Sequence, residues 1–186
     1  WQGYFCSVSC MDEQLGRVIN GPDRLRLRES TAIIFTTDHG YHLGEHGFWQ
    51  KANLHEEVVR VPLIISTPGI KPGRTSSLVE LVDLYPTITD LIEIPIPNGL
   101  HGKSLISILK NPNSKIRNTA LSIHKRNGGG LRSAEWHYMN YGEKGEELYD
   151  MIKDPHQYTN LVSSNDYASV LKAARAKFKT RMAAAK

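Results

Sequence analysis

The sequence is poor in cysteine, since Cys6 and Cys10 are the only two among 186 residues. Two thiols four positions apart neither form a disulfide framework nor match the ligand spacing of a zinc site, so we expect two small buried apolar side chains. Long apolar runs are missing as well, because none approaches the roughly 20 residues that a membrane-spanning helix needs. A large charge excess is also missing: 23 Lys and Arg residues face 19 Asp and Glu residues, which leaves a net charge of +4. We therefore expect neither a membrane span nor a nucleic-acid partner.

Basic side chains are densest near the C-terminus, among several alanines. We interpret this cluster as the exposed face of a helix rather than as a nucleic-acid-binding patch. It consists of Lys172, Arg175, Lys177, Lys179, Arg181 and Lys186.

The chain opens with Trp1 rather than Met and shows no signal-peptide pattern. We expect it to begin inside a longer protein, so a site found here could be part of a larger site. Its length suits one ordinary domain.

The first part of the chain has the pattern of an α/β fold. Helical spacing of apolar residues covers residues 4–20, and Asn20-Gly21-Pro22 predicts the end of that helix. Two β-branched runs, residues 31–37 and 61–66, are apolar on both faces, which is typical of buried parallel strands. The polar segment between them, residues 38–60, holds four of the eight histidines, and a loop of this length is more often functional than decorative.

The second part has a different texture. A helix is predicted over residues 82–92, with Asp83 as its N-cap and Pro86 in its first turn. A loop-rich stretch follows to residue 118, and from residue 119 short strand candidates separated by turns such as Asn127–Gly130 predict an antiparallel meander. A final helix is predicted over 166–184, with Asp166 as its cap. We therefore divide the chain into an α/β part, residues 1–118, and a small α+β part, residues 119–186.

The segment Asp38-His39-Gly40 stands at the end of the first predicted strand. Ligands of open α/β sheets bind beyond the carboxyl ends of the strands. A carboxylate and an imidazole there could both bind a cation if the backbone turned at once, and Gly40 permits such a turn. Alternatively, Asp38 caps a loop or a helix, and His39 is a solvated side chain.

The rest of the loop adds polar groups to this pair. His42, Glu45, His46 and Lys51 follow, spaced by glycines. A cation together with a positioned lysine suits an anionic ester, because the metal neutralises oxygens and the ammonium binds the remaining charge of a sulfate or phosphate.

Residues 36–51, TTDHGYHLGEHGFWQK, strongly resemble the second metal-binding segment of type I sulfatases, closest to the iduronate-2-sulfatase and choline-sulfatase-like branch. Further segments match the family in family order from about residue 4 to residue 161. They include the residues around MDEQLGRV near the N-terminus, RVPLI after the loop, VDLYPT, and ELYD followed by DP and NL.

The resemblance implies a fold: the C-terminal part of an alkaline-phosphatase-like sulfatase sheet between helices, followed by a small subdomain with an antiparallel sheet. It also implies hydrolysis of a sulfate ester, through one calcium ion and a formylglycine made from Cys or Ser in a Cys-x-Pro-x-Arg motif. By position, Asp38 and His39 correspond to metal ligands, and Lys51 to the catalytic lysine that grips the sulfate. An ion that prefers oxygen makes Asp38 the firmer ligand of the two.

Four further residues are candidates for substrate contact, each with a structural role as the alternative: Tyr41, His42, His46 and Arg132. The substrate implied is a sulfated small molecule or saccharide. By family habit the protein would be exported, to the periplasm or the extracellular space, or lysosomal.

The departures from the family matter equally. No Cys-x-Pro-x-Arg or Ser-x-Pro-x-Arg occurs, and Gln157 stands where Glu is usual. We expect the modified residue and the remaining metal ligands in a missing N-terminal part of the same protein, without which this chain is inactive. The alternatives are a phosphoesterase or phosphonate hydrolase of the same superfamily, and a non-catalytic subunit that binds sulfated sugars.

Overall fold

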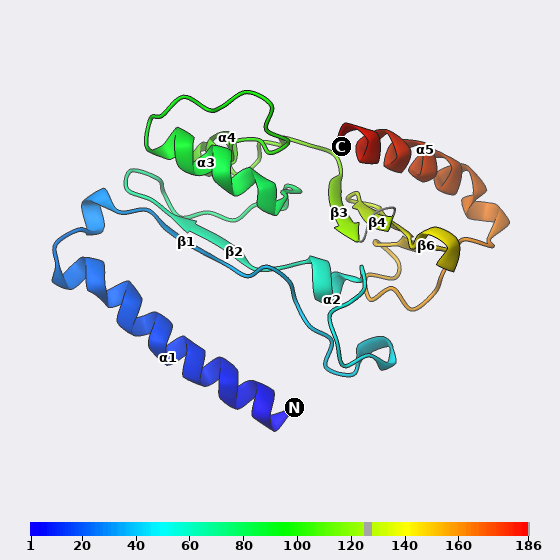
Figure 1. Ribbon diagram of the computed structural model, residues 1–186, viewed down its shortest axis with the longest axis horizontal. Coiled ribbons are helices and arrows are strands. Elements are labelled where there is room, and N and C mark those ends of the chain that lie inside the picture. Colours follow the sequence, from blue (N-terminus) through cyan, green and yellow to red (C-terminus); the bar gives the residue numbers. More distant parts are fainter. Residues whose placement is uncertain (125–127, 186) are drawn as a thin grey trace.

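The computed structural model describes residues 1–124 and 128–185 (Figure 1). One sheet pairs β1 (Ile33–Thr36) with β2 (Leu63–Ser66). The other is a four-stranded antiparallel meander of β3 (Ala120–His124), β4 (Gly128–Arg132), β5 (Trp136–Asn140) and β6 (Glu146–Asp150). The helices are α1 (Gln2–Arg24), α2 (Glu56–Val59), α3 (Leu84–Leu91), α4 (Ile106–Lys110) and α5 (Ala168–Ala184). Among the described residues, none of these helices combines the length and apolar character needed to cross a bilayer.

Helix α1 confirms the first predicted helix but ends later than expected. It continues through Pro22 to Arg24, because a proline this close to the end removes only one backbone hydrogen bond. Figure 1 shows α1 apart from the other elements, with its N-terminal end toward the loop after β1. None of its residues is buried, so Cys6 and Cys10 are exposed, contrary to the expectation.

Strands β1 and β2 are antiparallel, so the predicted parallel pairing is wrong. A parallel neighbour needs a crossover, usually a full helix over one face of the sheet. Here the intervening segment contains only the four-residue α2, and the Gly40 N–H donates to the Val58 carbonyl at 2.8 Å. This hydrogen bond brings the start and the end of the intervening segment together just beyond β1, and β2 then runs beside β1 in the opposite direction.

Two local expectations also fail, and a third is confirmed in part. Residues Gly128–Gly130 are not a turn but part of β4, where a Cβ on Gly129 would lie 2.6 Å from the Ser122 carbonyl oxygen, so glycine allows the close approach; Asn127 lies outside the described residues. Asp83 is the N-cap residue of α3 and Pro86 lies in the first turn, as predicted, but the Asp83 side chain makes no capping hydrogen bond because its carboxylate binds Arg117. Asp166 does not cap α5, which begins at Ala168 after a short 3₁₀ turn.

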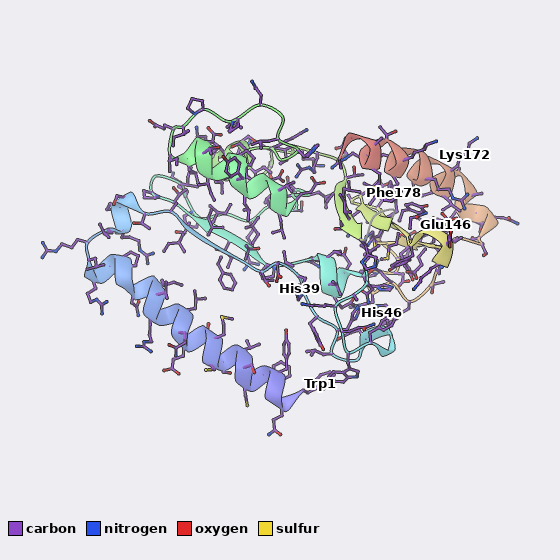
Figure 2. The ribbon with its side chains drawn as sticks, viewed as in Figure 1. Trp1, His39, His46, Glu146, Lys172 and Phe178 are labelled. Atoms are coloured by element: carbon purple, nitrogen blue, oxygen red, sulfur yellow. The ribbon has the colours of Figure 1, made fainter. Side chains whose placement is uncertain are left out.

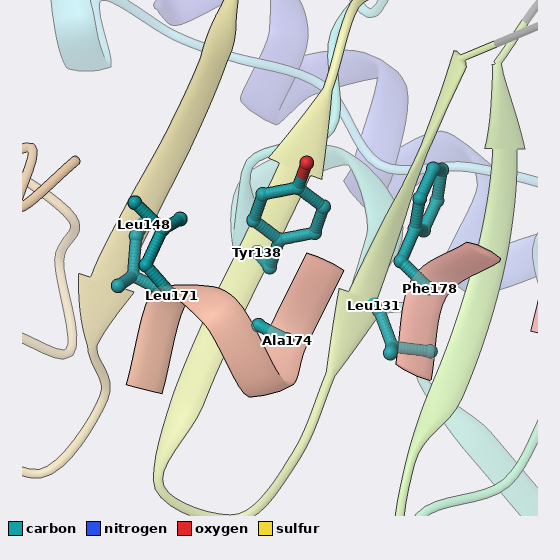
Figure 3. Close-up of a cluster of buried hydrophobic side chains, with 6 residues drawn as sticks. All are labelled: Leu131, Tyr138, Leu148, Leu171, Ala174 and Phe178. Carbon is teal, nitrogen blue, oxygen red and sulfur yellow. The ribbon is translucent and has the colours of Figure 1, made fainter. Parts of the chain in front are cut away.

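The main core lies between the meander and α5 (Figure 3). Leu131, Tyr138 and Leu148 come from β4, β5 and β6 and face the same side of the sheet, because they stand opposite one another in the strand register. Opposite them α5 presents Leu171, Ala174 and Phe178, spaced three and four residues apart along one helical face. The hydroxyl of Tyr138 donates to Glu146 at 2.7 Å, so its polar end is satisfied.

The opposite face of the meander holds the loop between β1 and β2. Leu54 packs there against Met139, Tyr149 and Met151. Polar contacts reinforce this apolar cluster, since the Glu56 N–H donates to the Gln157 side-chain oxygen at 2.8 Å. The loop that carries the predicted site is thus fastened to the C-terminal sheet.

A buried network of charged side chains makes a second connection between the residues before 119 and the C-terminal residues. The Arg117 guanidinium forms a two-pronged contact with the Asp83 carboxylate, and its Nη2 lies 2.6 Å from Asp83 Oδ1. Glu80 accepts hydrogen bonds from the Leu121 N–H of β3 and from Arg181 of α5. The division of the chain at residues 118–119 stays a prediction.

Candidate active site

Asp38 and His39 lie two and three residues beyond the end of β1. Figure 2 labels His39 at this place. Asp38 Oδ1 accepts hydrogen bonds from the His39 N–H and from the Thr37 hydroxyl, while the side chain as a whole is 84% exposed. Position 40 requires glycine because the backbone packs closely there, and a Cβ would meet the Glu57 carbonyl oxygen at 1.9 Å. The local backbone therefore presents a carboxylate to solvent at the strand end.

The surroundings of Asp38 favour the ionised form of its carboxyl group. Desolvation is the largest single influence and raises its pKa, but the His39 imidazole, the backbone N–H groups of Asp38 and His39, and the Thr37 hydroxyl together lower it more. The pKa of Asp38 therefore lies below its ordinary value, which favours the charged carboxylate.

His39 meets Lys51 although twelve residues separate them. His39 Nδ1 lies 2.8 Å from the Gly40 carbonyl oxygen. A carbonyl only accepts, so Nδ1 carries the hydrogen and the lone pair is on Nε2. Lys51 Nζ lies 2.7 Å from that nitrogen. The structure thus brings together Asp38, His39 and Lys51, and Lys51 is exposed rather than partly buried.

These residues fit part of a cation site. A histidine whose other nitrogen donates to a carbonyl is oriented as metal-bound histidines are, and Asp38 Oδ2 lies 3.6 Å from His39 Nε2. One lone pair cannot serve both an ammonium group and an ion, however, so His39 would have to exchange Lys51 for the cation. Within residues 1–124 and 128–185 no group of three or more such donors could hold a metal. Asp38 is the better cation ligand of the two and His39 the second, and the remaining ligands of a cation would have to come from outside this group.

The other predicted loop residues lie at different depths. Tyr41 is 39% exposed, and its hydroxyl donates to the Trp49 carbonyl at 2.7 Å. His42 is completely buried beside Asn53. His46 is mostly buried, with its ring stacked 4.3 Å from that of His55 and its Nε2 3.6 Å from Glu57. Burial, nearby His55 and His42 outweigh the attraction of Glu57 and lower the pKa of His46. Of the three, Tyr41 is the one at the surface.

Arg132 lies at the end of β4 and points toward α2. Its Nε donates to Glu56 at 3.0 Å, and its Nη1 donates to the Ser133 carbonyl. This geometry favours the structural alternative, in which Arg132 holds α2 against the meander.

The sequence did not predict that Asn53, Glu56 and Gln157 make the hydrogen bonds that support the site. Gln157 is buried, accepts from the Glu56 N–H, and donates from Nε2 to His137 Nδ1 at 2.9 Å. A carboxylate at this position could accept but not donate. Gln at position 157, where the family usually has Glu, therefore suits the neutral His137 beside it. In the sequence, this difference from the family was the one sign that residue 157 matters.

His137 makes folding sensitive to acid. Burial, reinforced by the positive charges of Arg132 and His55, lowers the pKa of His137 to about 3. An unfolded histidine has a pKa of about 6.5, so between these values the unfolded chain binds one more proton than the folded chain. We expect His137 to reduce the free energy of unfolding by about 1.4 kcal/mol per pH unit as the pH falls from about 6.5 toward 3, and to leave it unaffected above that window.

The measurement is urea unfolding of the complete protein between pH 4.5 and pH 7.5. His137→Gln should flatten the acid slope by the equivalent of one proton. The exposed His156 provides the control, because His156→Gln should leave the slope as it is. An unchanged slope in His137→Gln would reject this assignment.

Comparison with known proteins adds independent information. The family described as N-sulphoglucosamine sulphohydrolase, C-terminal, matches residues 44–184. An N-acetylglucosamine-6-O-sulfatase of Bacteroides thetaiotaomicron is 32% identical over 89% of the chain and 32% of the relative. A choline-sulfatase of Rhizobium meliloti is 31% identical over 88% of the chain and 33% of the relative. The chain thus spans about a third of the length of these relatives.

Solved structures give the same picture. BT4656 in complex with its substrate D-glucosamine-2-N,6-O-disulfate aligns with a TM-score of 0.88 and 28% identity, over 95% of this chain and 39% of that one. A phosphonate monoester hydrolase of Agrobacterium radiobacter aligns with a TM-score of 0.80 and 26% identity, over 92% of this chain and 38% of that one.

Proposed function

This chain belongs to the sulfatases, matching the C-terminal part of their sequences, and we propose that it contributes cation-binding and sulfate-binding groups to a sulfuric ester hydrolase. The observation that carries the proposal is the convergence of Asp38, His39 and Lys51 at the end of β1. An exposed carboxylate and an exposed ammonium group near each other suit an anionic substrate. A cation held by the carboxylate would bind one substrate oxygen, and the ammonium group would bind another directly.

Each residue has a proposed part in that site. Asp38 holds the cation, which when bound neutralises charge on the sulfate oxygens. His39 is oriented by the Gly40 carbonyl and either joins the cation or holds Lys51. Lys51 binds a sulfate oxygen and stabilises charge there. Carboxylate ligation agrees with calcium, which prefers oxygen donors.

Family membership implies a metal and a formylglycine in the complete enzyme. This sequence contains no Cys-x-Pro-x-Arg or Ser-x-Pro-x-Arg, so we place the formylglycine in a further, N-terminal part of the protein. The apolar side chains exposed along α1 support this partner, because they form an uncovered face of a 23-residue helix. They include Tyr4, Phe5, Val8, Met11 and Val18. By family habit we place the enzyme outside the cytosol or in the lysosome.

We propose a sulfated saccharide as the substrate class. The support is the sulfated glucosamine bound by BT4656 and the name of the N-acetylglucosamine-6-O-sulfatase relative. Exposed rings of Tyr41 and Trp49 beside the site, 39% and 53% exposed, offer surfaces on which a sugar ring could pack. The phosphonate hydrolase likeness keeps phosphonate monoesters as the second candidate.

The test is turnover by the complete, metal-loaded protein. Glucosamine 6-O-sulfate, choline sulfate and a phenyl phosphonate monoester are compared by the release of sulfate or phenol. We expect the highest kcat/KM for the sulfated sugar. Turnover of the phosphonate alone would replace the proposal with the second candidate, and sulfate binding without any turnover would replace it with a non-catalytic binding role.

A further inference from the structure

The loop that carries Lys51 is closed by its own hydrogen bonds. The His42 N–H donates to the Gln50 carbonyl at 3.1 Å, and the Gly44 N–H donates to the Phe48 carbonyl at 2.9 Å. Residues 42–50 therefore form a hairpin-like excursion whose base is His42 and Gln50. Lys51 is the first residue after that base.

The ring of His42 closes the loop a second time, just after Lys51. Both amide atoms of Asn53 lie near His42 Nε2, Nδ2 at 2.8 Å and Oδ1 at 3.0 Å. Asn53 Oδ1 also accepts from the His55 N–H at 3.2 Å, which fixes the orientation of the amide. His42 and Asn53 are both buried, so water does not compete with this contact.

Lys51 is thus held on both sides by one residue. The backbone of His42 binds residue 50, and the ring of His42 binds residue 53. A lysine has a long, flexible side chain, and the contact that holds its exposed head among the described residues is the 2.7 Å approach to His39. A displacement of about 1 Å of such a group can cost 10²-fold in rate, so the anchoring of its backbone matters.

We propose that His42 and Asn53 are positioning residues that hold Lys51 opposite His39, and that His42 does not contact the substrate. The inference rests on the proposed function of Lys51. His42 has no exposed surface with which to touch a substrate, whereas its hydrogen bonds reach Gln50, directly before the lysine, and Asn53, two residues after it.

The test is a double-mutant cycle in the complete enzyme with a sulfate ester as substrate. Asn53→Ala should lower kcat/KM by about 10- to 100-fold when Lys51 is present, and by less than about 2-fold in a Lys51→Ala background. It should also weaken the binding of inorganic sulfate, measured by calorimetry, in the first background only. Asn113→Ala, at an exposed asparagine, serves as the matched control and should change neither quantity.

Equal losses in the two backgrounds would overturn the proposal, because they would show that Asn53 acts through folding in general. If Asn53→Ala does not fold, His42→Leu takes its place in the same cycle, since leucine can fill the buried position but makes no hydrogen bond to Asn53. A wild-type enzyme that neither turns over a sulfate ester nor binds sulfate would remove the proposed function and this inference with it. An active wild type with equal losses would remove the inference alone.

Discussion

Replacing Lys51 with alanine in the complete enzyme is expected to lower kcat/KM for a sulfate ester by about 100-fold or more. The ammonium group stands 2.7 Å from His39 and beside the exposed Asp38 carboxylate, so it is placed before the substrate arrives. Losing one such preorganised charge-stabilising group costs about 10²- to 10³-fold in kcat in other enzymes. Lys51 is exposed, and its removal leaves no buried partner without a hydrogen bond, so the protein should stay folded.

The loss in activity is measured by initial rates, with thermal unfolding as the check on folding. Lys71→Ala removes a lysine that is also exposed but lies after β2, outside the loop, and should leave turnover unchanged. Lys51→Arg keeps the charge but changes its shape and reach, so it should recover only part of the activity. Wild-type turnover in a folded Lys51→Ala enzyme would exclude the lysine from the reaction.

Replacing Arg117 is expected to have the largest effect on stability. The guanidinium and the Asp83 carboxylate face each other with 5% and 0% of their side chains exposed. Burial by itself lowers the pKa of Arg117, but the hydrogen bonds to Asp83 and the charges of Glu80 and Asp83 raise it above its ordinary value, so the group remains a cation. Removing one partner of such a pair leaves an uncompensated buried charge and costs about 3–5 kcal/mol. Arg117→Ala should reduce the free energy of unfolding by that amount, measured by urea denaturation.

The chain contains its own control for this experiment. Arg28 and Asp23 form a similar Arg–Asp pair at 3.0 Å, but their side chains are 42% and 52% exposed. Water already solvates both groups, so Arg28→Ala should cost less than about 1 kcal/mol. The double variant Asp83→Asn, Arg117→Met should be more stable than Arg117→Met alone, because it removes the orphaned charge. An Arg117→Ala protein as stable as Arg28→Ala would contradict the buried network.

Periodicity and turn residues were enough to predict most elements. The helices near both ends, the helix after residue 82 and the antiparallel meander are all present, because their apolar residues repeat with the period of the element they form. The alkaline-phosphatase-like fold that the motifs implied is confirmed by the structural relatives. The parallel pairing of the two apolar strands was wrong, since an apolar run says how deeply a strand is buried but not in which direction its neighbour runs.

The candidate site was likewise predictable from the sequence only in part. The residue types from Asp38 to Lys51 were sufficient to propose a cation and an anionic ester at the end of a strand, because their chemistry depends on local spacing. The choice of a sulfate came from the resemblance to sulfatases. Whether His42 faces a substrate or Asn53, whether Arg132 is free or bound to Glu56, and why residue 157 is Gln could not be read from the sequence alone. Each depends on a hydrogen-bond partner between 11 and 101 residues away. Such partners are selected when packing removes water from polar groups, and only the tertiary structure decides which groups are buried together.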